Sequence, residues 1–380
     1  MRGTTKPKPK PAPETAAGQD RSTVLTPRER FAAIVAEFVA AGGKTDRVAE
    51  ALKQAFPSGG WTRESIYAEL RNGLASGYVS VDTIRSELGE RIRARAGLRS
   101  ATVISTAYME QVAAVAARRI LAILADLRET APGRPDDPEN IVRIGFASGH
   151  TMSRVARALA QLLLTTDLAI PYRLQFHALS STFDIRKLHE DPNFFLARFD
   201  EPAIAAHCET AISFVGLAAP SLIESSDLER FRNGPGMSVA TAEAKNLDIL
   251  VTGASDLDDP RSTMFEFYMK EAAEKERLRA LGCAGHLLYL PIGPKGPIDP
   301  SDLKFVMPTA LNLGQVADLA AGGSRVMLVT GPTRYTTDKE TKLGPKKIVA
   351  TILSQRPSLI TDLVIDERTA RHVHDSGVLA

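Results

Sequence analysis

The chain has 380 residues, of which 44% are hydrophobic and 24% are charged, a composition typical of soluble globular proteins. Lysines and arginines total 47 against 45 aspartates and glutamates, which excludes a chain-wide basic surface for nucleic acid and leaves only a local patch. Two cysteines exclude a disulfide framework, and without an uncharged apolar run of about 18 residues we expect a cytoplasmic protein with no membrane partner.

Residues 1–27 are predicted to form a disordered basic tail rich in proline. Three lysines alternate with three prolines over residues 6–11, and the segment offers almost nothing apolar to bury. Such a tail is more often a solubilising extension than an arm that follows a DNA backbone, but both interpretations stay open.

Residues 28–81 are predicted to form a small helical domain of the helix-turn-helix type, with a winged-like end. Apolar residues at helical spacing predict helices over 31–39 and 48–56, and Thr62 is a good N-cap for a third helix that runs to Gly77. Residues 78–81 alternate like a short strand. This order is typical of DNA-binding domains.

The exposed face of the third helix carries the candidate DNA-binding residues, which are Arg63, Glu64, Tyr67 and Arg71. Arg63, Tyr67 and Arg71 lie four residues apart and therefore share one face. Arginine suits bidentate contacts to guanine or phosphate, and tyrosine can donate to phosphate. The alternative is an oligomerisation bundle with a solvated polar face.

Residues 82–97 are predicted to form a connecting helix, and residues 98–380 an α/β domain. Short apolar runs alternate with helical stretches, a pattern that predicts a Rossmann-like fold with a mostly parallel sheet. The predicted strands are TVIS, IVRIGFA, YRLQFHAL, ISFVGL, LDILVTG, HLLYLP, RVMLVTG and TDLVID, with helices over 107–129 and 151–164 between the first of them.

The loop after the strand IVRIGFA is the best candidate ligand site. Small residues let a ligand approach the backbone, and the following helix presents free N–H groups and the positive end of its dipole. The candidate phosphate-binding residues are Ser148, Gly149, His150 and Thr151. Because no Gly-Lys-Ser/Thr follows, this is not a Walker loop. An ordinary strand-to-helix turn is the alternative.

Lys347 is the candidate ligand lysine from the other end of the domain. Lysines at a helix start oppose the dipole, so an anionic ligand is one reason for Lys346 and Lys347 to precede a helix there, and solvation is the other. We expect Lys347 and the loop Ser148–Thr151 to face one pocket at the carboxyl edge of the sheet.

No cofactor, metal or catalytic residue is predicted. His189, Glu190 and Asp191 adjoin in sequence but lack the spacing to further ligands that a metal site requires. No nucleophile elbow and no cysteine–histidine motif is present. In an enzyme, an aspartate such as Asp256 could serve as the base.

Taken together, the two halves resemble the SorC family of bacterial sugar-responsive transcriptional regulators over about residues 45–375. The resemblance rests on the strand–loop–helix Ile144–Leu159, the segment KIVATILSQRPSLITDLVIDERTA from Lys347, the run Gly282–Gly285, and WTRESIYAELRNGLASGYVSV from Trp61. In the closing segment Lys347, Asp366, Glu367, Thr369 and Ala370 are in register with the family.

The resemblance implies a Rossmann-like domain, related to sugar-phosphate isomerases and CoA transferases, that binds a phosphorylated sugar and thereby alters the grip of the N-terminal domain on operator DNA. It places Gly149, His150 and Thr151 at the phosphate and Lys347 at the effector. The sequence departs from the family at Thr252–Ser255, at His286 where an aspartate is usual, and at an insertion over 331–343.

The sequence therefore predicts a DNA-binding regulator that is modulated by a small anionic, phosphorylated sugar-like ligand. We expect a homo-oligomer, a dimer or tetramer, bound to double-stranded operator DNA in a bacterial cytoplasm and hence nucleoid-associated when bound. The alternatives are an isomerase-like sugar-phosphate enzyme with a helical appendage, and an effector-sensing interaction protein that binds no DNA.

Overall fold

The computed structural model describes residues 25–75, 84–130, 137, 140–182, 185–259, 262, 272–337 and 340–378. The chain divides into two compact units, residues 1–81 and 82–380. Residues 1–24 of the predicted tail and the predicted strand at 78–81 lie outside the described residues. Among the described residues, no helix is long and apolar enough to cross a membrane.

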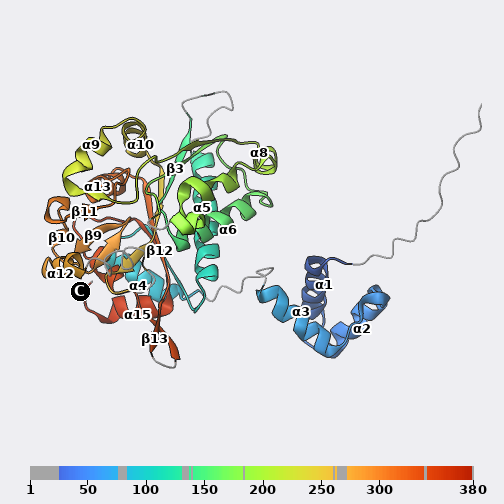
Figure 1. The fold of residues 1–380 in the computed structure, drawn as a ribbon. Helices are drawn as coiled ribbons and strands as arrows, with labels where there is room; N and C mark the ends of the chain where they lie inside the picture. Colours follow the sequence, from blue (N-terminus) through green and yellow to red (C-terminus); the bar gives the residue numbers. More distant parts are fainter. Residues whose placement is uncertain are drawn as a thin grey trace, which may run out of the picture. The chain divides into compact units, whose positions relative to one another are not determined.

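The described part of the smaller unit contains three α-helices, α1 (Pro27–Ala40), α2 (Thr45–Ala55) and α3 (Arg63–Ala75), seen in Figure 1. Its core is built by the predicted apolar stripes, with Ile34, Leu52 and Ile66 fully buried around Trp61. Thr62 caps α3 as predicted, because its Oγ1 accepts the Ser65 N–H at 3.1 Å. The short helix η1 (Pro57–Gly59) and Gly60, at φ 62°, make the turn between α2 and α3.

The described part of the larger unit contains a seven-stranded parallel sheet, which confirms the predicted α/β class. The strands in spatial order are β1 (Ser100–Ile104), β15 (Asp362–Asp366), β12 (Arg325–Thr330), β6 (Ile249–Thr252), β2 (Val142–Phe146), β3 (Arg173–Ala178) and β4 (Ala211–Val215). The central strands are near-continuous apolar runs, as expected for a sheet covered on both faces.

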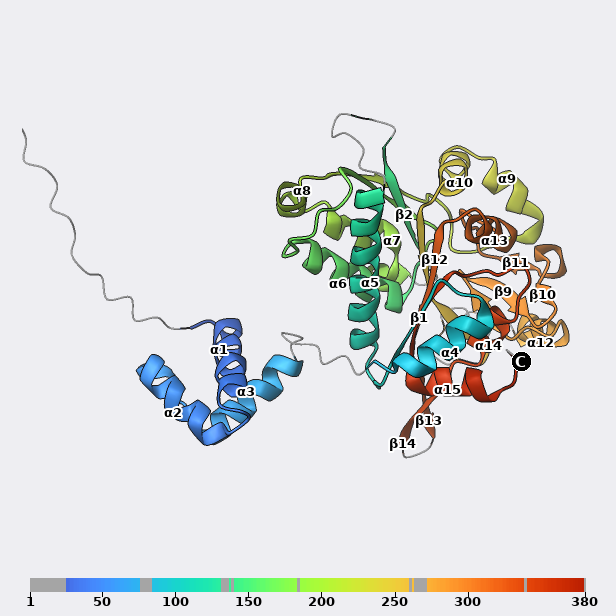
Figure 2. The same ribbon diagram turned by 180° about the vertical axis from the view of Figure 1, so that it is seen from behind.

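Helices cover both faces of this sheet. Figures 1 and 2 show α5 (Met109–Thr130) and α6 (His150–Leu163) on one side, and α10 (Met237–Ala244) and α13 (Leu313–Ala321) on the other. Among the described residues, the other α-helices of this unit are α4 (Ser86–Ala96), α7 (Pro192–Phe195), α8 (Pro202–Cys208), α9 (Leu228–Arg232), α12 (Ala272–Ala280), α14 (Ile348–Leu353) and α15 (Glu367–Asp375). The predicted connecting helix is α4, and its Ile92 and Ala96 belong to the core of the larger unit.

One predicted strand is wrong. HLLYLP is not a strand of the parallel sheet but the centre of a β-hairpin, formed by β8 (Gly285–Leu287) and β9 (Leu290–Gly293). The turn residues Leu288 and Tyr289 have φ of 53° and 61°, which suits a two-residue hairpin turn. With β7 (Ala254–Asp256) and β10 (Gly296–Pro297) the hairpin forms a separate antiparallel sheet. A run of apolar residues alone could not reveal the turn.

The insertion over 331–343 also has defined structure. It supplies an antiparallel hairpin of β13 (Thr333–Thr337) and β14 (Glu340–Gly344). A further pair, β5 (Ile223–Glu224) and β11 (Phe305–Val306), closes a small second core of this unit.

Candidate ligand pocket and helix surface

A pocket lies at the point where the strand order along the sheet reverses. From β2 the sheet grows through β3 to β4 on one side, whereas β6, β12 and β15 follow on the other. Ligands of open parallel sheets bind beyond the strand carboxyl ends at such a switch point. Residues after β2, β6 and β12 line a pocket of about 180 Å³ there, smaller than the roughly 300–1,000 Å³ typical of drug-sized ligand sites.

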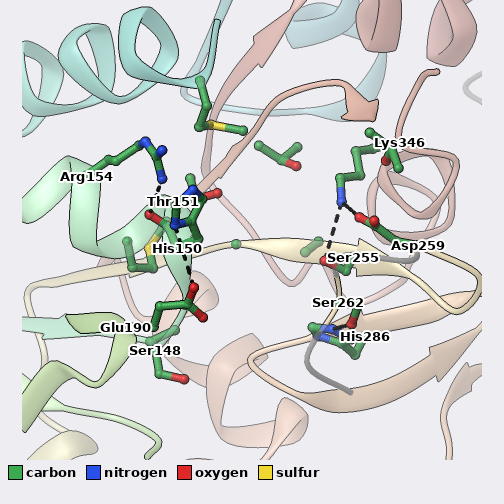
Figure 3. Close-up of a pocket in the computed structure, with 18 of the residues that line it drawn as sticks. Ser148, His150, Thr151, Arg154, Glu190, Ser255, Asp259, Ser262, His286 and Lys346 are labelled. Atoms are coloured by element: carbon green, nitrogen blue, oxygen red, sulfur yellow. Dashed lines mark hydrogen bonds and ion pairs between the residues drawn. The ribbon is translucent and has the colours of Figure 1, made fainter. Parts of the chain in front are cut away.

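Two groups of polar side chains face each other across this pocket (Figure 3). The group that we call the helix wall lies around the start of α6 and comprises Glu110, Ser148, His150, Thr151, Arg154 and Glu190. The group that we call the sheet wall lies around β7 and β8 and comprises Ser255, Asp259, Ser262, His286 and Lys346.

Part of the predicted phosphate cradle is already occupied by bonds within the fold. The Ser148 N–H donates to the Ser180 hydroxyl at 3.0 Å, and the Ser148 hydroxyl donates to the Ser181 carbonyl at 2.9 Å. The Gly149 N–H donates to the Glu190 carbonyl at 2.8 Å. The Ser153 N–H donates to the Gly149 carbonyl at 3.0 Å, so His150 and Thr151 belong to the first turn of α6, where the positive end of the helix dipole lies.

Charged groups of the helix wall are paired and partly exposed. Arg154 Nε lies 2.8 Å from Glu110 Oε1, and His150 Nδ1 lies 3.6 Å from Glu190 Oε1. Burial is the largest single influence on Glu110 and opposes its ionisation, but the hydrogen bond and charge of Arg154 and a backbone hydrogen bond together outweigh it, so the pKa of Glu110 is lowered.

The sheet wall is buried. Lys346 forms an ion pair with Asp259, with side-chain exposures of 8% and 4%, and its Nζ lies 3.4 Å from the Ser255 hydroxyl. His286 Nε2 lies 3.1 Å from the Ser262 hydroxyl, and its ring stacks on Tyr289. Burial, assisted by the Lys346 charge, lowers the pKa of His286 to about 3, so the imidazole is neutral at pH 7.

The structure brings four of the five predicted ligand residues to the pocket. Ser148, Gly149, His150 and Thr151 line it, whereas Lys347 is exposed and lines a separate hollow beside Asp256 and Asp258. The preceding residue, Lys346, reaches the pocket instead. The sequence favours Lys347 because Lys347, and not Lys346, matches the family motif.

Residues of the closing motif explain how Lys346 is held. Asp366 caps α15 by accepting the Thr369 N–H, and the Thr369 hydroxyl accepts the Lys346 N–H at 3.2 Å. Asp256 accepts the Ile348 N–H at 2.6 Å and so fixes the start of α14. Burial raises the pKa of Asp256. This carboxylate, the candidate base of the enzymatic alternative, is not among the residues that line the pocket.

The predicted DNA-binding face of α3 is exposed. Arg63, Glu64, Tyr67 and Arg71 are all solvent-accessible, and the Arg63 guanidinium lies 5.8 Å from the centre of the Tyr67 ring. The Tyr67 hydroxyl lies 3.2 Å from that of Thr45 at the start of α2. These contacts hold the tyrosine on the outer face of the helix between the two arginines.

Solved structures show what the fold resembles. The full-length sorbitol operon regulator SorC from Klebsiella pneumoniae superposes with a TM-score of 0.54 at 15% identity, covering 90% of this chain and 97% of that one. The chain therefore shares the fold of this regulator. A DeoR family transcriptional regulator from Listeria monocytogenes matches with a TM-score of 0.53 at 17% identity, over 76% of this chain and 98% of its own.

A domain of a possible sugar-binding transcriptional regulator from Arthrobacter aurescens TC1 matches equally, with a TM-score of 0.53 at 17% identity over 78% of this chain and 100% of that one. Neither a family model nor a curated protein matches the sequence. The SorC-type fold implied by the sequence resemblance is therefore confirmed on structural similarity.

Proposed function

We propose that the chain is a transcriptional regulator in which the smaller unit binds double-stranded operator DNA and the larger unit binds a small sugar-like ligand. The pocket at the switch point of the sheet is the observation that carries this proposal. Similarity over 90% of the chain to a sorbitol operon regulator supports it. The chain acts as a homo-oligomer, a dimer or tetramer, in a bacterial cytoplasm.

The ligand is hydroxyl-rich and carries a phosphate. Its hydroxyls bond to the paired carboxylates and hydroxyls of the two walls, and its phosphate binds at the start of α6, beside Thr151. A helix N-terminus favours an anion through both its free donors and its dipole. Lys346 contacts the opposite end of the ligand.

Regulation requires that the ligand binds the DNA-competent and DNA-incompetent states unequally. The coupling free energy in such systems is typically about 1–3 kcal/mol. We assign DNA contacts to Arg63, Tyr67 and Arg71, with Glu64 at the edge of the same face.

The test is a DNA-binding selection with the purified full chain, repeated with a panel of phosphorylated and unphosphorylated sugars. Arg63→Ala should weaken operator binding by about 1–3 kcal/mol if the arginine reads a base. Affinity should fall steeply with salt, because neutralising phosphates releases counterions. Absent or salt-insensitive DNA binding would favour the interaction-protein alternative, and turnover of a sugar phosphate would favour the enzyme.

A further inference from the structure

A cluster of two imidazoles and one carboxylate lies at the edge of the pocket; His150 and Glu190 belong to the helix wall, and His189 lies beside them. His150 is the first residue of α6, and His189 and Glu190 end the short helix η2 (Ile185–Glu190). One ligand-type atom from each residue lies within 4.8 Å of the other two. Figure 3 shows His150 directed toward Glu190.

The spacing fits one metal ion. His150 Nδ1 and His189 Nε2 lie 3.6 Å and 3.8 Å from Glu190 Oε1. Bonds of about 2.0–2.1 Å to a tetrahedral zinc ion place ligand atoms about 3.3 Å apart. The two separations from Glu190 exceed this value by only about 0.3–0.5 Å, and the two histidine atoms lie within 4.8 Å of each other. The 61%-exposed His189 side chain can rotate to shorten its own distances.

The backbone holds the cluster together before any ion binds. The hydrogen bond from the Gly149 N–H to the Glu190 carbonyl ties the end of η2 to the start of α6. Asp191, the next residue, is committed elsewhere, because its carboxylate accepts the N–H groups of Thr182 and Asn193. Glu190 is thus the carboxylate of this segment that faces both histidines.

The charge of the pocket supplies an independent reason for a cation. Among the described residues that line it, the carboxylates of Glu110, Glu190 and Asp259 outnumber the cations of Arg154 and Lys346. Both cations are already ion-paired, with Glu110 and Asp259 respectively. His286 adds no charge, because burial keeps it neutral. A phosphorylated ligand would enter a site whose fixed charge is negative.

We propose that His150, His189 and Glu190 bind a divalent transition metal ion of the zinc class, whose open coordination position takes an oxygen of the effector. Imidazole and carboxylate are ligands that suit zinc, and three protein ligands leave a fourth position open. His150 and Glu190 line the pocket, so that position is reachable by a ligand bound there. The effector contact rests on the proposed function; the metal site does not.

The experiment titrates tag-free, chelator-treated full-length protein with Zn²⁺ by calorimetry and with Co²⁺ by visible absorption. Wild type should bind one ion. His189→Ala and Glu190→Gln should weaken zinc binding by about 100-fold or more, because even outer-shell partners contribute about 10–100-fold. His207→Ala is the matched control, since His207 is an exposed histidine elsewhere whose ring contacts the Thr166 carbonyl.

Absence of stoichiometric binding by wild type, or equal binding by His189→Ala, would overturn the metal site. Neither DNA nor sugar enters this titration, so its failure is separate from failure of the proposed function, which the DNA-binding selection measures. Zinc should then raise the affinity for phosphorylated members of the sugar panel in wild type but not in His189→Ala. Zinc binding that leaves all those affinities unchanged would overturn the effector contact.

Discussion

The two walls of the pocket hold similar chemical groups in different surroundings. In the helix wall, Arg154 and Glu110 pair with side-chain exposures of 21% and 54%. In the sheet wall, Lys346 and Asp259 pair almost out of contact with water. A pair near the surface contributes little to stability and can exchange its partner for a ligand, whereas breaking a buried pair leaves a charge without compensation. The helix wall can therefore rearrange when a ligand binds, whereas the sheet wall keeps its geometry.

The largest expected effect comes from breaking the buried pair. Lys346→Met keeps most of the side-chain volume but leaves Asp259 unpaired, and should lower the free energy of unfolding of the larger unit by about 3–5 kcal/mol. Urea denaturation followed by far-UV circular dichroism measures it. Trp61, the single tryptophan, is buried in the smaller unit, so its fluorescence transition should stay unchanged as an internal control. A loss below about 1 kcal/mol would show that the pair is solvated.

The second effect is a dependence of stability on pH that comes from the sheet wall. The pKa of His286 is about 3 in the folded chain against about 6.5 when unfolded, so below pH 6.5 the unfolded chain takes up a proton that the folded chain excludes. Stability is therefore lost as the pH falls. Between pH 7 and pH 5, wild type should lose about 2 kcal/mol more than His286→Asn. Parallel pH profiles of the two proteins would contradict a buried, neutral imidazole.

A third, smaller effect tests the helix wall as a binding surface. Thr151→Val keeps the side-chain volume and removes one hydroxyl, so it should weaken binding of a phosphorylated ligand by about 0.5–1.5 kcal/mol. DNA binding without ligand should not change. Calorimetry with the best ligand from the panel measures the loss, and Thr165→Val, on a hydroxyl near the far end of α6, is the control. Equal affinities of Thr151→Val and Thr165→Val for the ligand would contradict a contact between Thr151 and the ligand.

The smallest effect concerns the exposed pair itself. A double-mutant cycle on Arg154→Ala and Glu110→Ala should give a coupling energy of only about 0.2–1 kcal/mol. Denaturation midpoints at low and high salt supply the measurement, and the coupling should shrink at high salt. A coupling as large as the loss expected for Lys346→Met would erase the difference between the walls.

The sequence predicted what is contiguous in the chain. Helices α1 to α3, the parallel sheet and the loop Ser148–Thr151 follow from periodicity and from one strand–loop–helix segment. The sheet wall did not follow, because Ser255, His286 and Lys346 come from three separate segments that meet only in the fold. The choice between Lys346 and Lys347 depends on which neighbouring side chain turns inward, and periodicity does not determine that before a six-residue helix.

The same reason explains the missed cluster. In the sequence, His189 and Glu190 lack the spacing to further ligands. His150 comes near them only in the fold, where the Gly149 N–H donates to the Glu190 carbonyl. The one signal of this cluster in the sequence is His150, a histidine that follows a glycine turn at the start of a helix. The prediction of a single strand over HLLYLP is wrong for a different reason: the turn within it contains neither glycine nor asparagine, so the sequence gives no turn signal.

That turn bears on how this protein could evolve or be engineered. A two-residue hairpin turn favours Asn-Gly, whereas Leu288 and Tyr289 each adopt the left-handed conformation at a cost of about 1–2 kcal/mol. Both side chains line the pocket. Two residues that are energetically unfavourable in this turn therefore supply side chains to the pocket. A design that replaced both residues with Asn-Gly would raise thermostability but remove two side chains from the ligand's binding surface. Stability and ligand binding would thus change in opposite directions at two adjacent positions.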